Sequence, residues 1–158
     1  MNANDLKKFL KNMDLSKAKL DNGNTVEEEL KHHADVLAAC IQQQLSVVYA
    51  SYMPVLYRRT FALQQSILTD SRVYAEVRGT TLLVSVRIGF DNGAWHTGFD
   101  GKKVNTALLI NEGWQTHGRF AHVPYFGFRE GTHFVERAIE AYRSKVKNPF
   151  DVQINYIE

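Results

Sequence analysis

The stretch that decides the fold is TVEEELKHHADVLAACIQQQLSVVYASYMPVLYRRTFALQQSI, from Thr25 to Ile67. At 100° per residue its apolar side chains fall on one narrow stripe: Leu30, Ala34, Leu37, Ile41, Leu45, Val48 and Tyr52. Polar side chains occupy the opposite face: Glu28, Lys31, His32, Asp35, Gln42, Gln43 and Ser46. This periodicity predicts a helix with one buried side.

Both ends of this helix carry a sequence signal. Thr25 can accept a backbone N–H bond as the N-cap, and Glu28 three residues later completes a capping box. Pro54 lacks an N–H and pushes the preceding residue out of the α region, so the helix should end near Tyr52. Such a helix would span roughly 40 Å at a rise of about 1.5 Å per residue, more than a core of this size requires.

A second apolar edge, formed by Val36, Cys40 and Val47, lies beside the main stripe. Two interpretations are open. The edge either contacts a neighbouring subunit or widens the core contact within the chain. The lone Cys40 excludes an internal disulfide and indicates a small buried hydrophobic residue rather than a nucleophile.

Length and composition are typical of one folded domain spanning residues 1–158, with 44% hydrophobic and 23% charged residues. Residues 1–24 form a candidate N-terminal arm that contains a short helix, and docking of this piece on its own domain is the alternative. No apolar run suggests a membrane span or signal peptide, so the chain is expected to stay in the cytoplasm where it is made. A net charge of +2 is too small to indicate a nucleic-acid-binding protein.

The segment after this stretch predicts a β-hairpin. Gly79-Thr80 suits a type II′ turn, which places Val77 opposite Leu82. Two further apolar pairs follow outward, Ala75 with Val84 and Val73 with Val86, so one side of the hairpin is expected to face the core.

Residues 91–105 form a long flexible loop or a mobile hairpin, with three glycines. Trp95, Phe99, Lys102 and Lys103 in this loop are candidate partner contacts, although Trp95 folding back onto the sheet is the commoner outcome. The loop lacks the Gly-Lys-Ser/Thr ending of a phosphate-binding loop, so no nucleotide is expected.

The C-terminal third completes an α+β fold. A short helix is predicted from Val104 to Glu112, ending at Gly113, followed by an irregular segment with some strand to Gly131. Thr132 is expected to cap an amphipathic helix that ends before Pro149, and residues 150–156 alternate like a final strand. The predicted architecture is an antiparallel sheet packed by the long N-terminal helix and this C-terminal helix.

The sequence shows no reactive constellation. The six histidines lack metal-ligand spacing, and a zinc site would need several of them to converge with Cys40 or a carboxylate. Ser66 has no glycine-flanked nucleophile elbow. We therefore predict no catalytic residues, no cofactor and no metal, and a protein that is not an enzyme.

The run Pro54-Val55-Leu56-Tyr57-Arg58-Arg59-Thr60-Phe61-Ala62-Leu63-Gln64-Gln65-Ser66-Ile67 resembles a signature of the HK97 gp10-like family of tailed bacteriophages. In that family a long helix ends in a Pro-x-x-Tyr-x-Arg-Thr-Gly-x-Leu-x-x-Ser-Ile type of segment, followed by strands, a glycine-containing segment and a C-terminal amphipathic helix. The likeness covers roughly residues 25–147. Two departures are Phe61, where the family usually has glycine, and the extra strand after Pro149.

The resemblance implies a structural virion protein, a ring-forming tail-completion or head-tail connector subunit in the neck. Its implied partners are further copies of itself and other neck and tail proteins, namely a connector or stopper, a tail terminator or a tail tube. DNA would only pass through the lumen, and no membrane is involved. The implied location is the virion neck or tail, after assembly in the host cytoplasm.

The resemblance also implies structural roles in the motif. Arg58 and Arg59 would pair with carboxylates, and Thr60 would cap the next helix. Apart from the resemblance, we expect Tyr57, Leu63 and Ile67 to be the apolar contacts that lock the segment to the sheet. The alternative function is a small nucleic-acid-binding or nucleic-acid-processing protein that uses Arg58, Arg59, Lys102 and Lys103 on one face.

Overall fold

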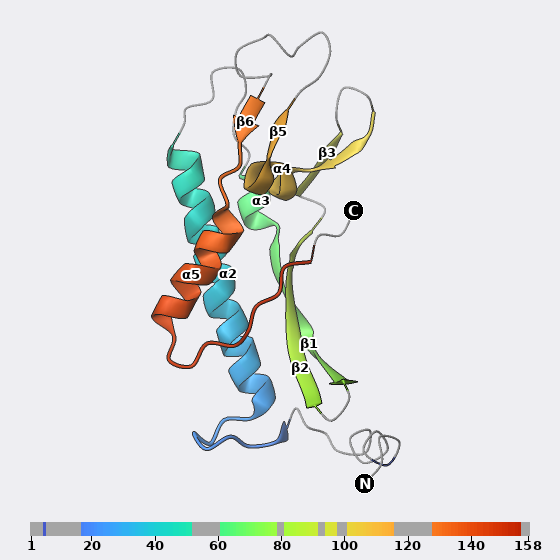
Figure 1. Ribbon diagram of the computed structural model, residues 1–158, viewed down its shortest axis with the longest axis vertical. Helices are drawn as coiled ribbons and strands as arrows, with labels where there is room; N and C mark the ends of the chain where they lie inside the picture. The colour runs from blue at the N-terminus through green and yellow to red at the C-terminus, as the bar shows by residue number, and fades with distance from the viewer. Residues whose placement is uncertain are drawn as a thin grey trace. The chain divides into compact units, whose positions relative to one another are not determined.

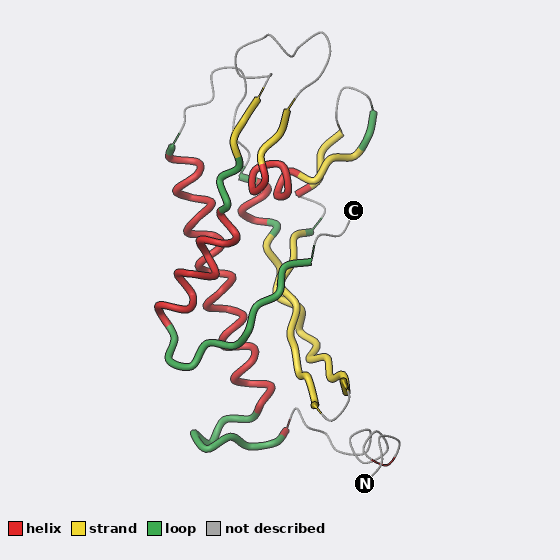
Figure 2. Tube along the Cα trace, viewed as in Figure 1, coloured by secondary structure: helices red, strands yellow, loops and turns green. Residues whose placement is uncertain are grey.

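The computed structural model describes residues 5, 17–51, 61–78, 81–91, 94–97, 101–115 and 128–155. Its helices and strands, labelled as in Figure 1, are α2 (Val26–Ala50), α3 (Ala62–Gln65), β1 (Ile67–Arg78), β2 (Thr81–Phe90), β3 (Trp95–Thr97), β4 (Lys103–Asn105), α4 (Thr106–Glu112), β5 (Gly113–Gln115), β6 (Phe128–Glu130) and α5 (Phe134–Lys145). The chain combines helices with two-stranded sheets of neighbouring strands (Figure 2), which confirms the predicted α+β class.

The chain divides into two compact units. One contains Met1–Val36 and Thr69–Gly89, and the other contains Leu37–Leu68 and Phe90–Glu158. The boundaries fall inside α2, β1 and β2 rather than in loops. The predicted single domain with an arm at residues 1–24 stays a prediction.

Helix α2 begins as the sequence predicts. Thr25 Oγ1 accepts the Glu28 N–H at 3.2 Å, and the Glu28 carboxylate accepts the Thr25 N–H at 2.8 Å, which completes the capping box. The Thr25 N–H foremost, and then the Thr25 hydroxyl, which donates to the same carboxylate at 2.9 Å, lower the pKa of Glu28. Just before the helix, Gly23 turns the chain in the left-handed region with a φ of 85°.

The main apolar stripe of α2 is buried as predicted: Leu30, Ala34, Leu37, Ile41, Leu45 and Val48. Tyr52 and Pro54 lie outside the described residues, and the helix ends at Ala50. With 25 residues the helix is about 38 Å long. Among the described helices, none combines the length and the apolar character needed to cross a membrane.

The helix predicted near residues 60–68 is shorter than expected. It spans Ala62–Gln65, and Ile67 already belongs to strand β1. Its N-cap is Phe61, and Thr60, the predicted cap, lies outside the described residues. The helix is shorter because Phe61 adopts the left-handed conformation (φ 57°, ψ 14°), which delays its start to the next residue.

The predicted hairpin is present as the neighbouring strands β1 and β2, which leave only residues 79–80 to connect them. On its predicted core side Val73, Val84 and Val86 are half-buried and Ala75 is exposed, while the burial of Val77 and Leu82 lies outside what the structure describes. The described part of this side is therefore less buried than the pairing pattern predicted.

The described part of residues 91–105 forms a short hairpin, which was one of the two predicted alternatives. Strand β3 pairs antiparallel with β4, with Trp95 opposite Asn105. Helix α4 therefore begins at Thr106 and not at Val104, and Asn105 caps it by accepting the Leu108 N–H at 3.2 Å. The helix ends at Gly113 as predicted, where φ is 84°.

Strands β5 and β6 pair antiparallel, with Gly113 opposite Glu130, and lead into α5. The predicted capping role of Thr132 is wrong. His133 is the N-cap in a left-handed conformation, while the Thr132 hydroxyl donates to the Ile110 carbonyl at 2.8 Å. Within the second unit α5 lies beside the C-terminal half of α2 (Figure 1), where Lys145 Nζ donates to Gln43 Oε1 at 3.0 Å.

The predicted final strand is wrong, because residues 150–155 have no strand pairing. The Phe150 N–H donates to the buried Tyr142 hydroxyl at 2.9 Å, and Asp151 approaches Arg143 at 4.0 Å. These two contacts hold the segment against α5.

Candidate functional site

The predicted interface edge of α2 is divided between surface and interior. Cys40 is 1% exposed, so it offers no surface to a partner. Val36 is half-buried, and Val47 is 52% exposed. Of the three, Val47 alone presents a large apolar surface to solvent, so the interface prediction now depends chiefly on this residue.

The predicted contacts of residues 91–105 have different environments. Lys102 and Lys103 are exposed, and Trp95 is half-buried in strand β3. Ala94 next to it is fully buried and anchors the start of this segment. Phe99 lies outside the described residues.

Three of the seven residues of the family-like motif can be placed. Leu63 is 4% exposed, and the buried Ser66 donates its hydroxyl to the Leu63 carbonyl at 2.7 Å. The Ser66 carbonyl in turn accepts the Asp91 N–H at 2.8 Å, which joins the motif to the end of strand β2. Ile67 is half-buried at the start of β1. The other motif residues lie outside the described residues: Pro54, Tyr57, Arg59 and Thr60.

The backbone is closely packed at the junction between α4 and α5. A Cβ atom on Gly113 would lie 2.4 Å from the Arg129 carbonyl oxygen, and one on Gly131 would lie 2.4 Å from the Asn111 carbonyl oxygen. Neither position can accept a side chain without moving backbone. The two glycines thus allow the end of α4 and the start of α5 to touch.

Asn111 connects the two helices through its side chain, which is 2% exposed. Its Nδ2 donates to Glu112 at 2.7 Å and to Glu136 at 3.2 Å, and its Oδ1 accepts the Val135 N–H at 3.0 Å. The last bond supplies the cap that His133, the N-cap residue, does not make with its own side chain. Asn111 therefore orders the first turn of α5.

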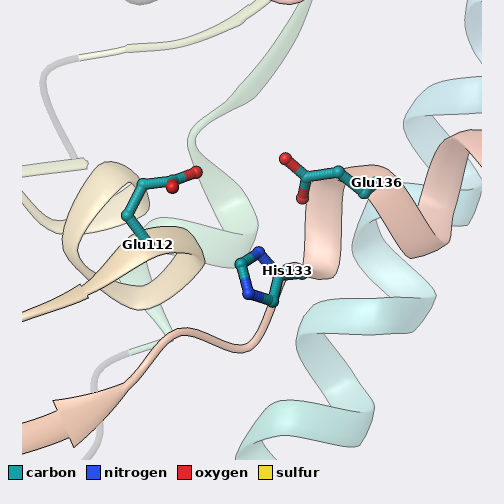
Figure 3. A group of neighbouring side chains, drawn as sticks. All are labelled: Glu112, His133 and Glu136. Carbon is teal, nitrogen blue, oxygen red and sulfur yellow. The ribbon is translucent and has the colours of Figure 1, made fainter.

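Glu112, His133 and Glu136 converge at this junction (Figure 3). Their potential ligand atoms all lie within 4.8 Å of one another. Glu112 ends α4, His133 precedes α5, and Glu136 lies in the first turn of α5. Two carboxylates and an imidazole form a donor set that binds divalent metal ions. One oxygen, Glu136 Oε2, is buried without a hydrogen-bond partner among the described residues.

The sequence did not indicate this group. Glu112 stands 21 residues before His133 in the chain, and no metal-ligand spacing links them. The available signal was the pair Gly113 and Gly131, which bracket the intervening segment and permit the close approach. From the sequence alone, Gly113 was interpreted as a helix end and Gly131 as a loop residue.

Large apolar side chains are also exposed in the second unit. The most exposed are Phe128 at 70%, Leu68 at 54% and Val47 at 52%, and Phe61, Phe150 and Ile154 are exposed as well. Phe128 lies on β6, whose described partner is β5 alone. Exposed aromatic and aliphatic residues of this size are typical of surfaces that meet other proteins.

Comparison with known proteins returned no relative: no protein-family model, no curated protein and no solved structure matches this chain.

Proposed function

We propose that the protein is a structural subunit of a tailed-bacteriophage neck, a ring-forming tail-completion or head-tail connector protein and not an enzyme. The observation that carries the proposal is the backbone conformation of Phe61. Phe61 occupies the position at which the HK97 gp10-like signature usually has glycine, and its φ is 57°. The local backbone therefore has the conformation that the family residue would favour.

A left-handed conformation costs roughly 1–2 kcal/mol for a residue with a Cβ atom and little for glycine. A phenylalanine there needs a compensating contact. The Phe61 ring packs edge-to-face against the Tyr49 ring of α2, with centroids 5.4 Å apart. The chain thus retains the turn that a glycine would make and stabilises it through the preceding helix.

Self-association is supported by the exposed apolar residues Val47, Leu68 and Phe128. A monomer gains nothing from exposing them, whereas burial between subunits contributes about 25 cal/mol per Å² of apolar surface. A ring places every subunit in the same environment, because a closed head-to-tail contact repeats one interface around the axis. This is the geometry that the proposed neck location requires.

The partners proposed beyond the ring are a connector or stopper on one side and a tail terminator or tail tube on the other. DNA would pass through the lumen without being read. The exposed Lys102 and Lys103 would then act at a contact between proteins or towards the lumen. Assembly would occur in the host cytoplasm and end in the virion neck.

The nucleic-acid alternative requires Arg58, Arg59, Lys102 and Lys103 to share one face. The two arginines lie outside the described residues, so this arrangement has no structural support. The alternative predicts DNA binding that falls steeply with salt, because phosphate contacts release counterions. A ring subunit should show no such binding at physiological salt.

The proposed assembly is tested with two single variants, Val47→Asp and Phe128→Asp. Self-association of each is measured by light scattering, and its fold by thermal melting. A charge placed in an interface is desolvated only on assembly, so self-association should weaken while the fold persists. Gln42→Asp is the matched control, since Gln42 is also exposed on α2 and lies about 140° around the helix from Val47. Equal association of all three variants and wild type would contradict an interface at these residues.

A further inference from the structure

We propose that Glu112, His133 and Glu136 bind one divalent transition-metal ion, with Zn²⁺ as the best-fitting chemistry. The ion would join the last residue of α4 to the first turn of α5. The site is independent of the proposed neck function. Its three residues lie outside the family-like motif and are not among the exposed apolar residues.

The first support is geometric. The three ligand atoms lie within 4.8 Å of one another, although they come from a helix end, an N-cap residue and the next helix. Ligand atoms about 2.0–2.2 Å from a zinc ion are roughly 3.3–3.6 Å apart in a tetrahedron. Small side-chain rotations therefore suffice to close the set around an ion.

The second support is that the backbone already holds these residues in place. His133 is fixed in the left-handed region with a φ of 49°, and its N–H donates to the Asn111 carbonyl at 3.0 Å. Gly113 and Gly131 permit the two backbones to touch where a Cβ atom would collide. Binding would cost little rearrangement of the chain, which favours affinity.

The third support is a buried carboxylate oxygen without a hydrogen-bond partner among the described residues. Asn111 donates one hydrogen bond to each carboxylate, which leaves Glu136 Oε2 buried and without a hydrogen-bond partner among the described residues. A buried oxygen of an ionised carboxylate is costly unless a cation or donor faces it. The α5 dipole favours a negative charge in this turn but does not supply a bond to that oxygen.

Charge and ligand type point to the class of ion. Two carboxylates with a neutral imidazole carry a charge of −2, which balances a divalent cation. Imidazole suits zinc and other first-row transition ions, whereas magnesium prefers oxygen ligands and retains its water. Three protein ligands leave a fourth position for solvent. Asn111 would be the neighbour that orients both carboxylates, as hydrogen-bonded partners of metal ligands commonly do.

The experiment is isothermal titration of the full-length, EDTA-treated and dialysed protein with Zn²⁺, repeated with Mg²⁺. We expect one Zn²⁺ per chain and no measurable Mg²⁺ binding. Glu136→Gln keeps the shape of the side chain and an acceptor for Asn111 but removes the charge. His133→Asn keeps a residue that tolerates the left-handed conformation. Each variant should weaken Zn²⁺ binding by at least about tenfold.

Two matched controls separate the site from surface binding. Glu140→Gln removes an exposed carboxylate from the same helix, and His32→Ala removes one of the adjacent histidines of α2. Both should bind Zn²⁺ as wild type does. A Zn²⁺-dependent rise in the melting temperature, reversed by EDTA, should occur in wild type and both controls and be clearly smaller in the two site variants.

The competing explanation is that a protonated His133 simply pairs with the two carboxylates. In that case Glu136→Gln and His133→Asn would lower the melting temperature in EDTA while wild type binds no stoichiometric zinc. That result would overturn the proposal, and so would equal zinc binding by wild type and the site variants. Neither result would bear on ring assembly, which light scattering measures separately.

Discussion

Replacement of Asn111 by alanine should destabilise the second unit more than its small volume suggests. Asn111 is 2% exposed and links α4 to α5 through three hydrogen bonds. The bond to the Val135 N–H acts as a helix cap and contributes about 1 kcal/mol. The bond to Glu136, a partly buried carboxylate, contributes roughly 1.5–2 kcal/mol, and we assign nothing to the bond with the exposed Glu112, since water replaces it. We therefore expect a loss of about 3 kcal/mol in the free energy of unfolding.

The assay is urea unfolding followed by circular dichroism, in EDTA so that no metal contributes. With an m-value of about 1–3 kcal/mol per molar urea, the midpoint should fall by roughly 1–3 M. Asn111→Asp keeps an acceptor for the Val135 N–H but replaces the donor with a carboxylate oxygen facing Glu112 and Glu136. It should cost at least as much as alanine, because like charges repel across a partly buried junction.

The control for Asn111 is Asn155→Ala, at an exposed asparagine beyond α5. Its stability should stay within about 0.5 kcal/mol of wild type. A midpoint for Asn111→Ala that matches this control would refute the account of the junction. It would mean that the helices are held together by apolar packing alone and that the hydrogen bonds of Asn111 are replaced by water without cost.

Three further changes test other parts of the fold. Leu63→Ala should cost roughly 2–5 kcal/mol by urea unfolding, because Leu63 is 4% exposed and the change leaves a cavity. Phe61→Gly should be more stable than Phe61→Ala by about 1 kcal/mol, since both lose the Tyr49 contact but only glycine relieves the left-handed backbone. The pKa of Glu28 lies below its usual 4.5, chiefly because the Thr25 N–H bonds the ionised form, so its contribution is present above pH 4.5 and is lost as pH falls through the lowered pKa. The stability gap between wild type and Glu28→Gln should therefore shrink in acid, and carboxyl NMR titration should give the lowered pKa directly.

These three predictions can fail in distinct ways. Leu68→Ala, at a position 54% exposed, is the control for Leu63 and should change stability by less than about 0.5 kcal/mol. Equal stability of the glycine and alanine variants at position 61 would show that the backbone there relaxes out of the left-handed region. A stability gap at Glu28 that is constant from pH 7 to strongly acid conditions would contradict the capping box.

Local signals in the sequence predicted the parts of the fold that depend on them. The period of the α2 stripe predicted which residues are buried, and Thr25 with Glu28 predicted the helix start through bonds between close neighbours. Gly113 marked the end of α4 for the same reason, because a positive φ, here 84°, favours glycine. These features depend on interactions between residues that lie within one or two helical turns of each other.

The errors concern positions where distant segments decide the structure. Apolar alternation after Pro149 resembled a strand, but a hydrogen bond from Phe150 to Tyr142 holds this segment against α5. Thr132 looked like a helix cap, yet its hydroxyl donates to Ile110, 22 residues earlier. In both cases a contact with another element replaced the local preference.

The candidate metal site could not be predicted for the same physical reason. Glu112 and His133 meet because two glycine backbones touch, and that contact depends on the pairing of β5 with β6. The spacing of the histidines along the chain does not indicate this contact. The exposure of Phe128 and Val47 could not be predicted from the sequence either. A hydrophobic period shows which residues are apolar, but not which of them the fold leaves exposed to solvent.

The central claim, that this chain assembles into a ring of a phage neck, is tested most directly by mass. Native mass spectrometry of the purified protein should give a single closed oligomer whose mass is a whole multiple of 18.1 kDa, and addition of isolated phage tail tubes should shift that oligomer as a unit. A mass of 18.1 kDa at every concentration, with and without tail tubes, would contradict the claim.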